Sequence, residues 1–71
     1  MAGVQEVEIR GEIIRLGQLL KAAGVAGTGA EAKELIAAGR VAVNGDVETR
    51  RGRQLHRGDV VTAGEDAVRL T

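Results

Sequence analysis

The residues best suited to chemistry stand in one block, RRGRQLHR, at positions 50–57. This block holds four arginines and no acid, in a chain whose ten basic and ten acidic residues balance. A guanidinium can donate two parallel hydrogen bonds to a phosphate, and Gly52 lets a phosphate approach the backbone. The block is therefore a candidate phosphate-binding site. The competing interpretation is a solvated, charged loop that keeps a small protein soluble.

The remaining charges are distributed unevenly along the chain. Residues 1–39 carry four basic and five acidic side chains, residues 40–57 carry five arginines and two acids, and residues 58–71 carry one basic and three acidic side chains. The three segments thus hold −1, +3 and −2 charges, an asymmetry typical of a nucleic-acid-binding surface. The chain has no Phe, Trp or Tyr, so it lacks the aromatic platforms on which many single-strand binders stack bases.

Catalytic and metal-binding patterns are absent from the sequence. It contains no serine and no cysteine, and its single histidine, His56, has no carboxylate beside it in sequence. We therefore expect no enzymatic activity, no cofactor and no metal site. The strongest competing motif is GVAG at positions 24–27, which has the G-x-x-G pattern with which KH domains clamp a nucleic-acid backbone.

Two short helices are predicted. Apolar residues at 16, 19, 20 and 23 follow helical spacing and stop at Gly24. A second helix is predicted over residues 29–38, because Thr28 and Glu31 have the spacing of a capping box and Gly39 follows the last apolar residue. Its buried face should consist of Ala32, Leu35 and Ile36. Helices of this length joined by about four residues form a helical hairpin.

Strand patterns flank the helical hairpin. A strand is predicted over residues 4–9, where Val7 and Ile9 alternate with Glu6 and Glu8. Val41 and Val43 lead into Asn44-Gly45, a strong tight-turn signal. Further strands are predicted over residues 60–62 and 67–70. The expected fold is a single α+β domain over residues 1–71, in the order β-α-α-β-β-β, with the hairpin packed on a small twisted antiparallel sheet.

Three stretches of the chain together resemble the RNA-binding alpha-L domain of the ribosomal protein S-four type. They read LGQLLKAAG, TGAEAKELIAAGRVAVNG and ETRRGRQLHRGDVV. The resemblance is closest to its stand-alone bacterial YaaA/YbcJ-like members and covers about residues 14–61. It implies binding to structured RNA on the face where the helical hairpin meets the first β-loop. The matching positions are Lys21, Lys33, Arg50, Arg51 and Arg53. Arg40, at the junction between the second helix and the next strand, is a neighbouring candidate for the same RNA contact. Thr28-Gly29 stands where many relatives carry Ser-Arg.

Some of these cations also have structural explanations. Lys21 falls in the last turn of its helix, where a positive charge complements the helix dipole, and Arg40 could cap open carbonyl groups beyond the second helix. Lys33 has a weaker structural explanation, because its i+4 neighbour is Ala37 and no helix-stabilising ion pair is predicted.

The sequence thus predicts a non-catalytic RNA-binding protein that recognises structured RNA, either ribosomal RNA or tRNA, in ribosome assembly or translation. A ribosomal particle is an expected partner, and we expect a monomer. No apolar run approaches the roughly 18 residues of a membrane span, so we expect a cytoplasmic protein without membrane contact. The alternative function is a protein-interaction module whose basic patch binds an acidic partner.

Overall fold

The two helices are short, and the second begins directly after the capping residue that the sequence predicts. The computed structural model describes residues 3–71, with helix α1 at Leu16–Ala22 and helix α2 at Gly29–Ala37. The Thr28 Oγ1 accepts a 3.1 Å hydrogen bond from the Glu31 N–H, as the capping-box spacing predicts. In a capping box the Glu side chain also accepts a hydrogen bond from the N–H of the capping residue. Here Glu31 Oε2 accepts instead from the N–H of Gly27, one residue earlier, at 2.9 Å.

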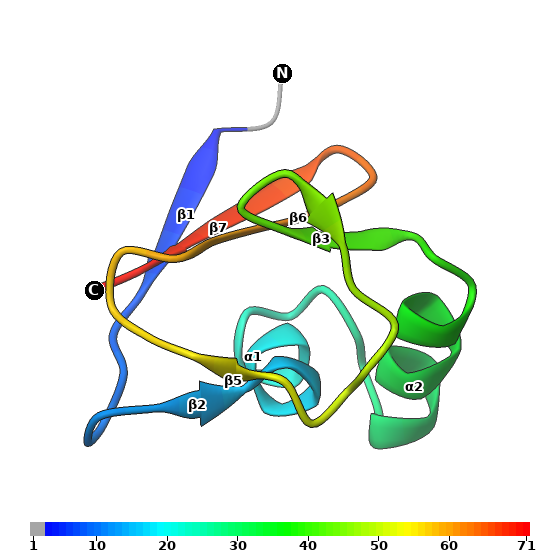
Figure 1. Cartoon of the computed structure of the whole chain (residues 1–71), viewed down its shortest axis with the longest axis horizontal. Helices are drawn as coiled ribbons and strands as arrows, with labels where there is room; N and C mark the ends of the chain where they lie inside the picture. Colours follow the sequence, from blue (N-terminus) through cyan, green and yellow to red (C-terminus); the bar gives the residue numbers. More distant parts are fainter. Residues whose placement is uncertain (1–2) are drawn as a thin grey trace.

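In the described part of the chain, seven strands form two sheets. Their bounds are β1 Val4–Val7, β2 Ile14–Arg15, β3 Val41–Val43, β4 Asp46–Val47, β5 Gln54–Leu55, β6 Val60–Ala63 and β7 Asp66–Leu70. The larger sheet has the order β1-β7-β6-β3-β4, and β2 pairs with β5 in a separate two-stranded ribbon. Figure 1 shows the helices and the β2–β5 ribbon on the same side of the larger sheet.

The α+β class and the helical hairpin predicted from the sequence are confirmed, but the sheet is mixed and not wholly antiparallel. Strand β1 runs parallel to β7, with Val4 opposite Ala67 and Val7 opposite Leu70. Backbone hydrogen bonds from Ile9 N–H to the Thr71 carbonyl and from Thr71 N–H to the Val7 carbonyl, 2.9 and 3.0 Å long, extend this pairing. The predicted order has four strands where the described residues form seven. The missing strands include β2 and β5, because strands of two residues are too short to show a period of two.

The predicted tight turn joins β3 to β4. Asn44 and Gly45 both adopt positive φ angles, 51° and 89°, which matches the turn type that favours Asn-Gly in β-hairpins. Strand β4 is only two residues long, and Val47 within it is 65% exposed. The hairpin therefore ends quickly, and the chain leaves the sheet directly into the arginine block.

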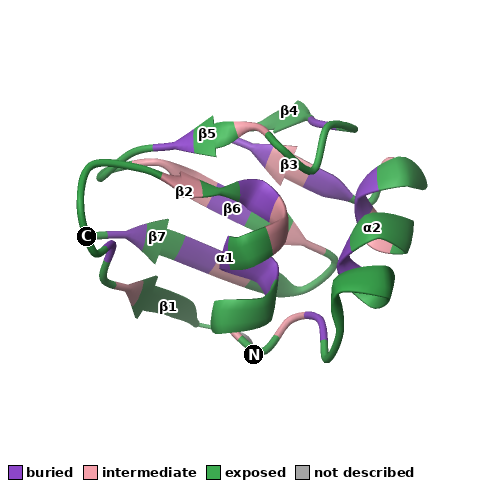
Figure 2. Cartoon of the chain, turned by 90° about the horizontal axis from the view of Figure 1, so that it is seen from below, coloured by how far each residue is buried: buried purple, intermediate pink, exposed green. Residues whose placement is uncertain are grey.

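The core is entirely aliphatic, as a sequence without aromatic residues requires. The buried apolar residues are Ile9, Leu16, Leu19, Leu20, Ala26, Ala32, Ile36, Val41, Val43, Leu55, Val61, Val68 and Leu70. They lie between the larger sheet and the layer of helices and ribbon (Figure 2). Leu35, which was expected in the core, is only half-buried. Leu55 is fully buried and anchors the end of the arginine block.

Within residues 3–71, neither helix combines the length and apolar character needed to cross a bilayer.

Candidate functional site

The arginine block begins beside a buried carboxylate. Glu48 is only 6% exposed and is the one buried charged residue among those the structure describes. Its Oε1 accepts hydrogen bonds from Arg50 Nη2 at 2.9 Å and Arg53 Nη1 at 3.2 Å, and its Oε2 accepts from Arg50 Nε at 3.1 Å. The Arg50 guanidinium in particular lowers the pKa of Glu48 from 4.5 to about 2. Two of the three arginines predicted to bind phosphate are therefore already held by a carboxylate.

Arg51 lies between these two arginines in sequence but has a different environment. Its side chain forms no hydrogen bond or ion pair with any other residue in the described part of the chain. It borders a groove of about 250 Å³ between the two helices and the loop that precedes β5. The residues lining this groove are Arg15, Gly17, Gln18, Lys21, Gly29, Ala32, Lys33, Arg51 and Gly52. We call this the basic groove, because four of these residues are cationic and none is acidic.

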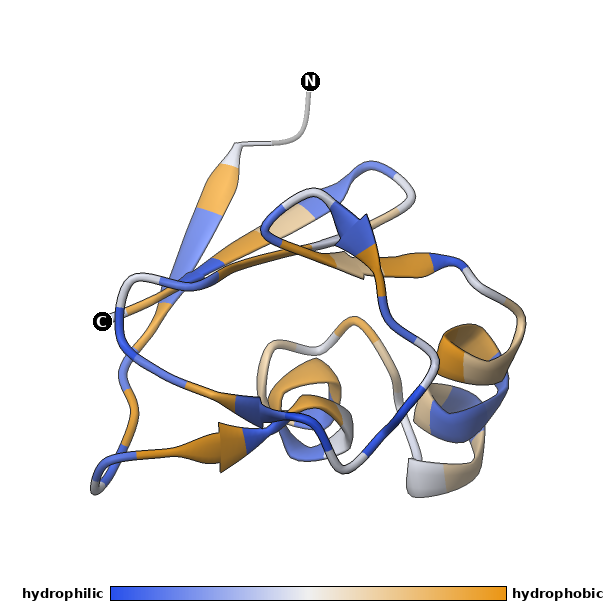
Figure 3. Cartoon of the chain, in the orientation of Figure 1, coloured by the Kyte–Doolittle hydropathy of each residue, from blue (hydrophilic) through white to orange (hydrophobic). Residues whose placement is uncertain are grey.

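Backbone hydrogen bonds place residues 48–53, which connect β4 to β5 and are called the arginine loop, against the start of α1. The N–H of Leu16 donates to the Arg53 carbonyl and the N–H of Gly17 donates to the Arg51 carbonyl, both at 2.9 Å. Arg15 Nη1 donates to the Gly52 carbonyl at 3.1 Å. The β2–β5 ribbon continues this contact, with Arg15 opposite Gln54. Figure 3 shows the segment between β4 and β5 as a mainly hydrophilic stretch.

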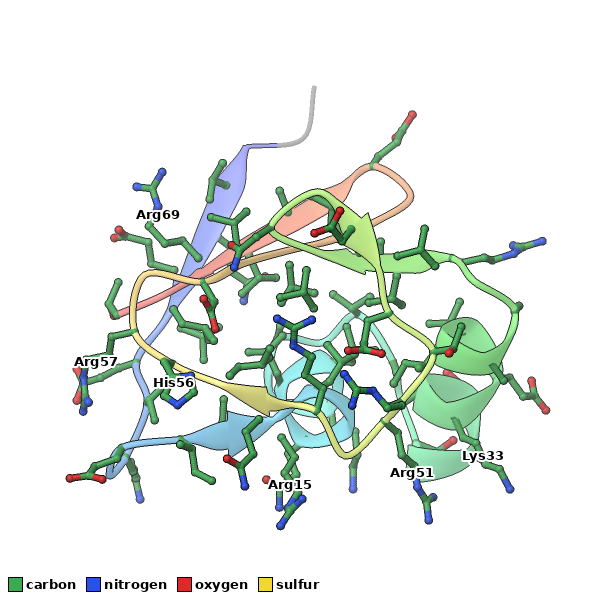
Figure 4. The ribbon with its side chains drawn as sticks, in the orientation of Figure 1. Arg15, Lys33, Arg51, His56, Arg57 and Arg69 are labelled. Atoms are coloured by element: carbon green, nitrogen blue, oxygen red, sulfur yellow. The ribbon has the colours of Figure 1, made fainter. Side chains whose placement is uncertain are left out.

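The two predicted lysines complete the groove from the helices. Lys21 is exposed in the last turn of α1, and Lys33 is exposed in α2. Neither forms an ion pair within residues 3–71. Figure 4 shows Arg15, Arg51 and Lys33 along the same edge of the molecule. Of the residues predicted from the sequence, Lys21, Lys33 and Arg51 are thus brought together, and their amine and guanidinium groups are free to bind an anion.

Arg50 and Arg53 lie beside the basic groove. They border a second hollow, of about 450 Å³, with Gly52 and Gln54. The Arg50 side chain is 76% exposed and that of Arg53 is 34% exposed, so Arg50 can still meet a ligand that extends beyond the groove. Its charge, however, is partly offset by Glu48.

Arg40 lies apart from the basic groove. It follows α2 and lines a hollow that it shares with Glu31 and Glu34, and a second hollow that includes Asp66. Its surroundings are therefore acidic. The RNA contact predicted for Arg40 stays a prediction, and its position gives it no part in the groove formed by the other cations.

Sequence reasoning missed Arg15. This residue immediately precedes α1, and its backbone N–H donates to Gln18 Oε1 at 3.2 Å. Only the pairing of β2 with β5 brings it to Gly52, and two-residue strands leave no periodic signal. An isolated arginine directly before a helix start was the single available clue.

The far end of the arginine block has a structural role. Arg57 Nη2 donates to the Ile9 carbonyl at 3.1 Å, and Figure 4 shows Arg57 well away from Arg51. Asp59 accepts hydrogen bonds from the His56 N–H at 2.8 Å and from Asn44 Nδ2 at 3.0 Å. Burial raises the pKa of Asp59, but these hydrogen bonds together with nearby positive charge, including that of Arg53, lower it more, so the net shift is downward. The sequence Arg57-Gly58-Asp59 is therefore part of a turn.

Comparison with known proteins defines the class of the chain. Residues 7–71 match the S4 domain family, and the chain belongs to that family. The curated protein described as "Probable ribosome maturation protein RlbA", from Bacillus subtilis, is 46% identical over 55 residues, which cover 78% of each chain. The solution structure of YbcJ from E. coli, described as revealing an alpha-L motif involved in RNA binding, superposes with a TM-score of 0.67. It is 32% identical in sequence, and the match covers 96% of this chain and 85% of YbcJ.

These matches confirm the resemblance to the S-four-type alpha-L domain, and they set aside the KH interpretation of residues 24–27. In the structure, that stretch contributes Ala26 to the core.

Proposed function

We propose that this S4 domain binds structured RNA in the basic groove, without catalysing a reaction, and that its RNA belongs to the ribosome or to tRNA. The observation that carries the proposal is the convergence of four cations from separate segments on one groove without an acid. Arg15 comes from β2, Lys21 and Lys33 from the two helices, and Arg51 from the loop before β5. Such a surface attracts the phosphate backbone.

The chemistry of the groove favours folded RNA over a flexible single strand. The protein has no Phe, Trp or Tyr on which an unpaired base could stack. Phosphate contacts position an RNA without reading its sequence, so selectivity must come from the fixed spacing of the cations. That spacing is set by two helices and a loop that is hydrogen-bonded to α1, a rigid frame suited to the fixed phosphate positions of a helix or junction.

The comparisons support a role near the ribosome. The name of the Bacillus subtilis relative refers to ribosome maturation, and YbcJ from E. coli is described as carrying a motif involved in RNA binding. We propose that this protein likewise acts on ribosomal RNA or on an assembling ribosomal particle. A monomeric state and a cytoplasmic location stay predictions, which size-exclusion chromatography with light scattering and cell fractionation would check.

Direct binding measurements test the proposal. The purified protein should bind ribosomal RNA extracted from ribosomes, or bulk bacterial tRNA, more tightly than it binds poly(U). With four phosphate contacts, a plot of log affinity against log salt concentration should have a slope of roughly −2.8 to −3.6. Equal affinity for poly(U), or a slope near zero, would contradict the proposal.

A pull-down from bacterial lysate separates RNA from an acidic protein partner. Partners captured through RNA should be lost after nuclease treatment, whereas partners bound through protein contacts should remain. Retention of the same proteins after complete RNA digestion would favour the protein-interaction module instead.

A further inference from the structure

The carboxylate of Glu48 bonds to the backbone as well as to the side chains of the arginine loop. Its Oε2 accepts from the N–H groups of Thr49 and Arg50 at 3.0 and 3.2 Å, in addition to the guanidinium contacts. The two oxygens together accept five hydrogen bonds, more than the roughly four lone-pair sites of a carboxylate, so its capacity to accept is fully used.

The Glu48 carboxylate takes over from strand pairing just after the end of β4. Residues 48–50 belong to no helix or strand. The Glu48 N–H still donates to the Val41 carbonyl at 2.9 Å, whereas the N–H groups of Thr49 and Arg50 find their acceptor in the Glu48 carboxylate. On the other side of the loop, Gly17 N–H and Arg15 Nη1 hold the carbonyls of Arg51 and Gly52. The loop is therefore fixed at both ends, by Glu48 before Arg51 and by the start of α1 after it.

Arg51 is the arginine that this arrangement leaves unpaired. Arg50 and Arg53, on either side of it, are hydrogen-bonded to Glu48, while Arg51 borders the basic groove. We propose that Glu48 is a positioning residue for RNA binding: it holds the loop so that Arg51 faces the groove. The inference rests on the proposed function and adds an acidic residue to the determinants of affinity.

Simple electrostatics predicts the opposite effect. Removing a negative charge next to a phosphate-binding groove should strengthen RNA binding, because it increases the attraction. If Glu48 acts through Arg51, removing its charge should weaken binding despite the gain in net positive charge. The sign of the change in affinity therefore distinguishes the two accounts.

The test is a double-mutant cycle with Glu48→Gln and Arg51→Ala. The unmodified protein is first titrated with ribosomal RNA and with bulk bacterial tRNA, and the cycle is then measured on whichever RNA it binds more tightly. Glutamine keeps the shape of the side chain but has one acceptor oxygen where glutamate has two. We expect Glu48→Gln to weaken binding about tenfold, which corresponds to about 1.4 kcal/mol. Arg51→Ala should weaken it by a similar factor, and the double variant should bind no more weakly than Arg51→Ala alone.

Glu65→Gln is the matched control, because Glu65 is exposed in the turn between β6 and β7 and its loss changes net charge equally. It should leave affinity unchanged or slightly increased. A Glu48→Gln variant that binds as tightly as the unmodified protein, or whose effect adds fully to that of Arg51→Ala, would overturn this inference but not the proposed function. If the unmodified protein binds neither RNA, the proposed function is overturned and the inference with it.

Two further measurements keep the inference testable if Glu48→Gln is unstable. Glu48→Asp retains the charge but shortens the side chain by one methylene, so it should also weaken binding, and unchanged affinity would count against positioning. Amide hydrogen exchange without RNA should be slow at Thr49 and Arg50 in the unmodified protein and faster in Glu48→Asp. Equal exchange in both proteins would show that Glu48 does not fix the loop.

Discussion

The guanidinium of Arg15 donates a 3.1 Å hydrogen bond to the carbonyl oxygen of Gly52, across 37 positions of sequence. This contact joins the residue before α1 to the loop that carries Arg51. Both residues also line the basic groove. Arg15 therefore supports one wall of the groove and contributes positive charge to it.

Replacing Arg15 should weaken RNA binding. Arg15→Ala removes a charged donor, and a hydrogen bond to a charged group contributes roughly 1.5–3 kcal/mol, so we expect about a tenfold or greater loss of affinity for ribosomal RNA or tRNA. Arg15→Lys should give an intermediate loss, because lysine keeps the charge without the planar guanidinium. Arg69→Ala is the control, because Arg69 is exposed on β7 and Figure 4 shows it far from Arg15. An equal loss in Arg69→Ala would mean that net charge alone determines affinity.

Arg51→Ala should impair RNA binding more than Arg50→Ala. The two arginines are adjacent and carry the same charge, but Arg50 forms a 2.9 Å ion pair with Glu48 whereas Arg51 borders the basic groove. Parallel titrations of the two variants with the same RNA measure this difference. If Arg50→Ala loses as much affinity as Arg51→Ala or more, the ligand lies outside the groove.

Glu48 should make the protein sensitive to acid. Hydrogen bonds from Arg50 lower the pKa of Glu48 from 4.5 to about 2 in the folded protein, so the folded state favours the ionised carboxylate. The resulting stability is present above pH 4.5 and is lost as the pH falls toward 2. Urea denaturation at several pH values should show a steeper loss of unfolding free energy in this range for the unmodified protein than for Glu48→Gln. Parallel pH profiles for the two proteins would contradict this prediction.

Thr28 should stabilise the start of α2. Its hydroxyl oxygen accepts the Glu31 N–H at 3.1 Å, and loss of such a cap costs about 1 kcal/mol. Thr28→Ala should lower the free energy of unfolding by about that amount in urea denaturation, and Thr28→Ser should largely preserve it. Equal stability of the alanine and serine variants would show that the cap contributes little.

Local signals explain which parts of the fold were predictable from the sequence. The start of α2 and the Asn44-Gly45 turn depend on residues within a few positions of each other, and both were predicted correctly. The parallel pairing of β1 with β7 joins the two ends of the chain, and the β2–β5 ribbon joins strands of two residues. Neither pairing leaves a periodic pattern, so neither could be found without the tertiary structure.

The same distinction applies to the candidate site. Lys21, Lys33 and Arg51 were identified through the family resemblance, and the structure places all three on one groove. The different roles of Arg50 and Arg51 depend on the burial of Glu48, which results from packing and not from the order of residues. Arg15 reaches the groove only through the β2–β5 pairing, and Arg40 lies among acidic residues contributed by α2 and β7.

Mapping the RNA contact surface by NMR tests the central claim most directly, and a chain of 71 residues is well suited to this method. Ribosomal RNA fragments or tRNA would be added to the ¹⁵N-labelled protein, and changes in the amide signals followed. The account predicts that the largest changes occur at Gly17, Lys21, Gly29, Lys33 and Gly52, which line the basic groove. Changes concentrated instead around Val25, Arg40 and Gly64, or no changes at any RNA concentration, would contradict it.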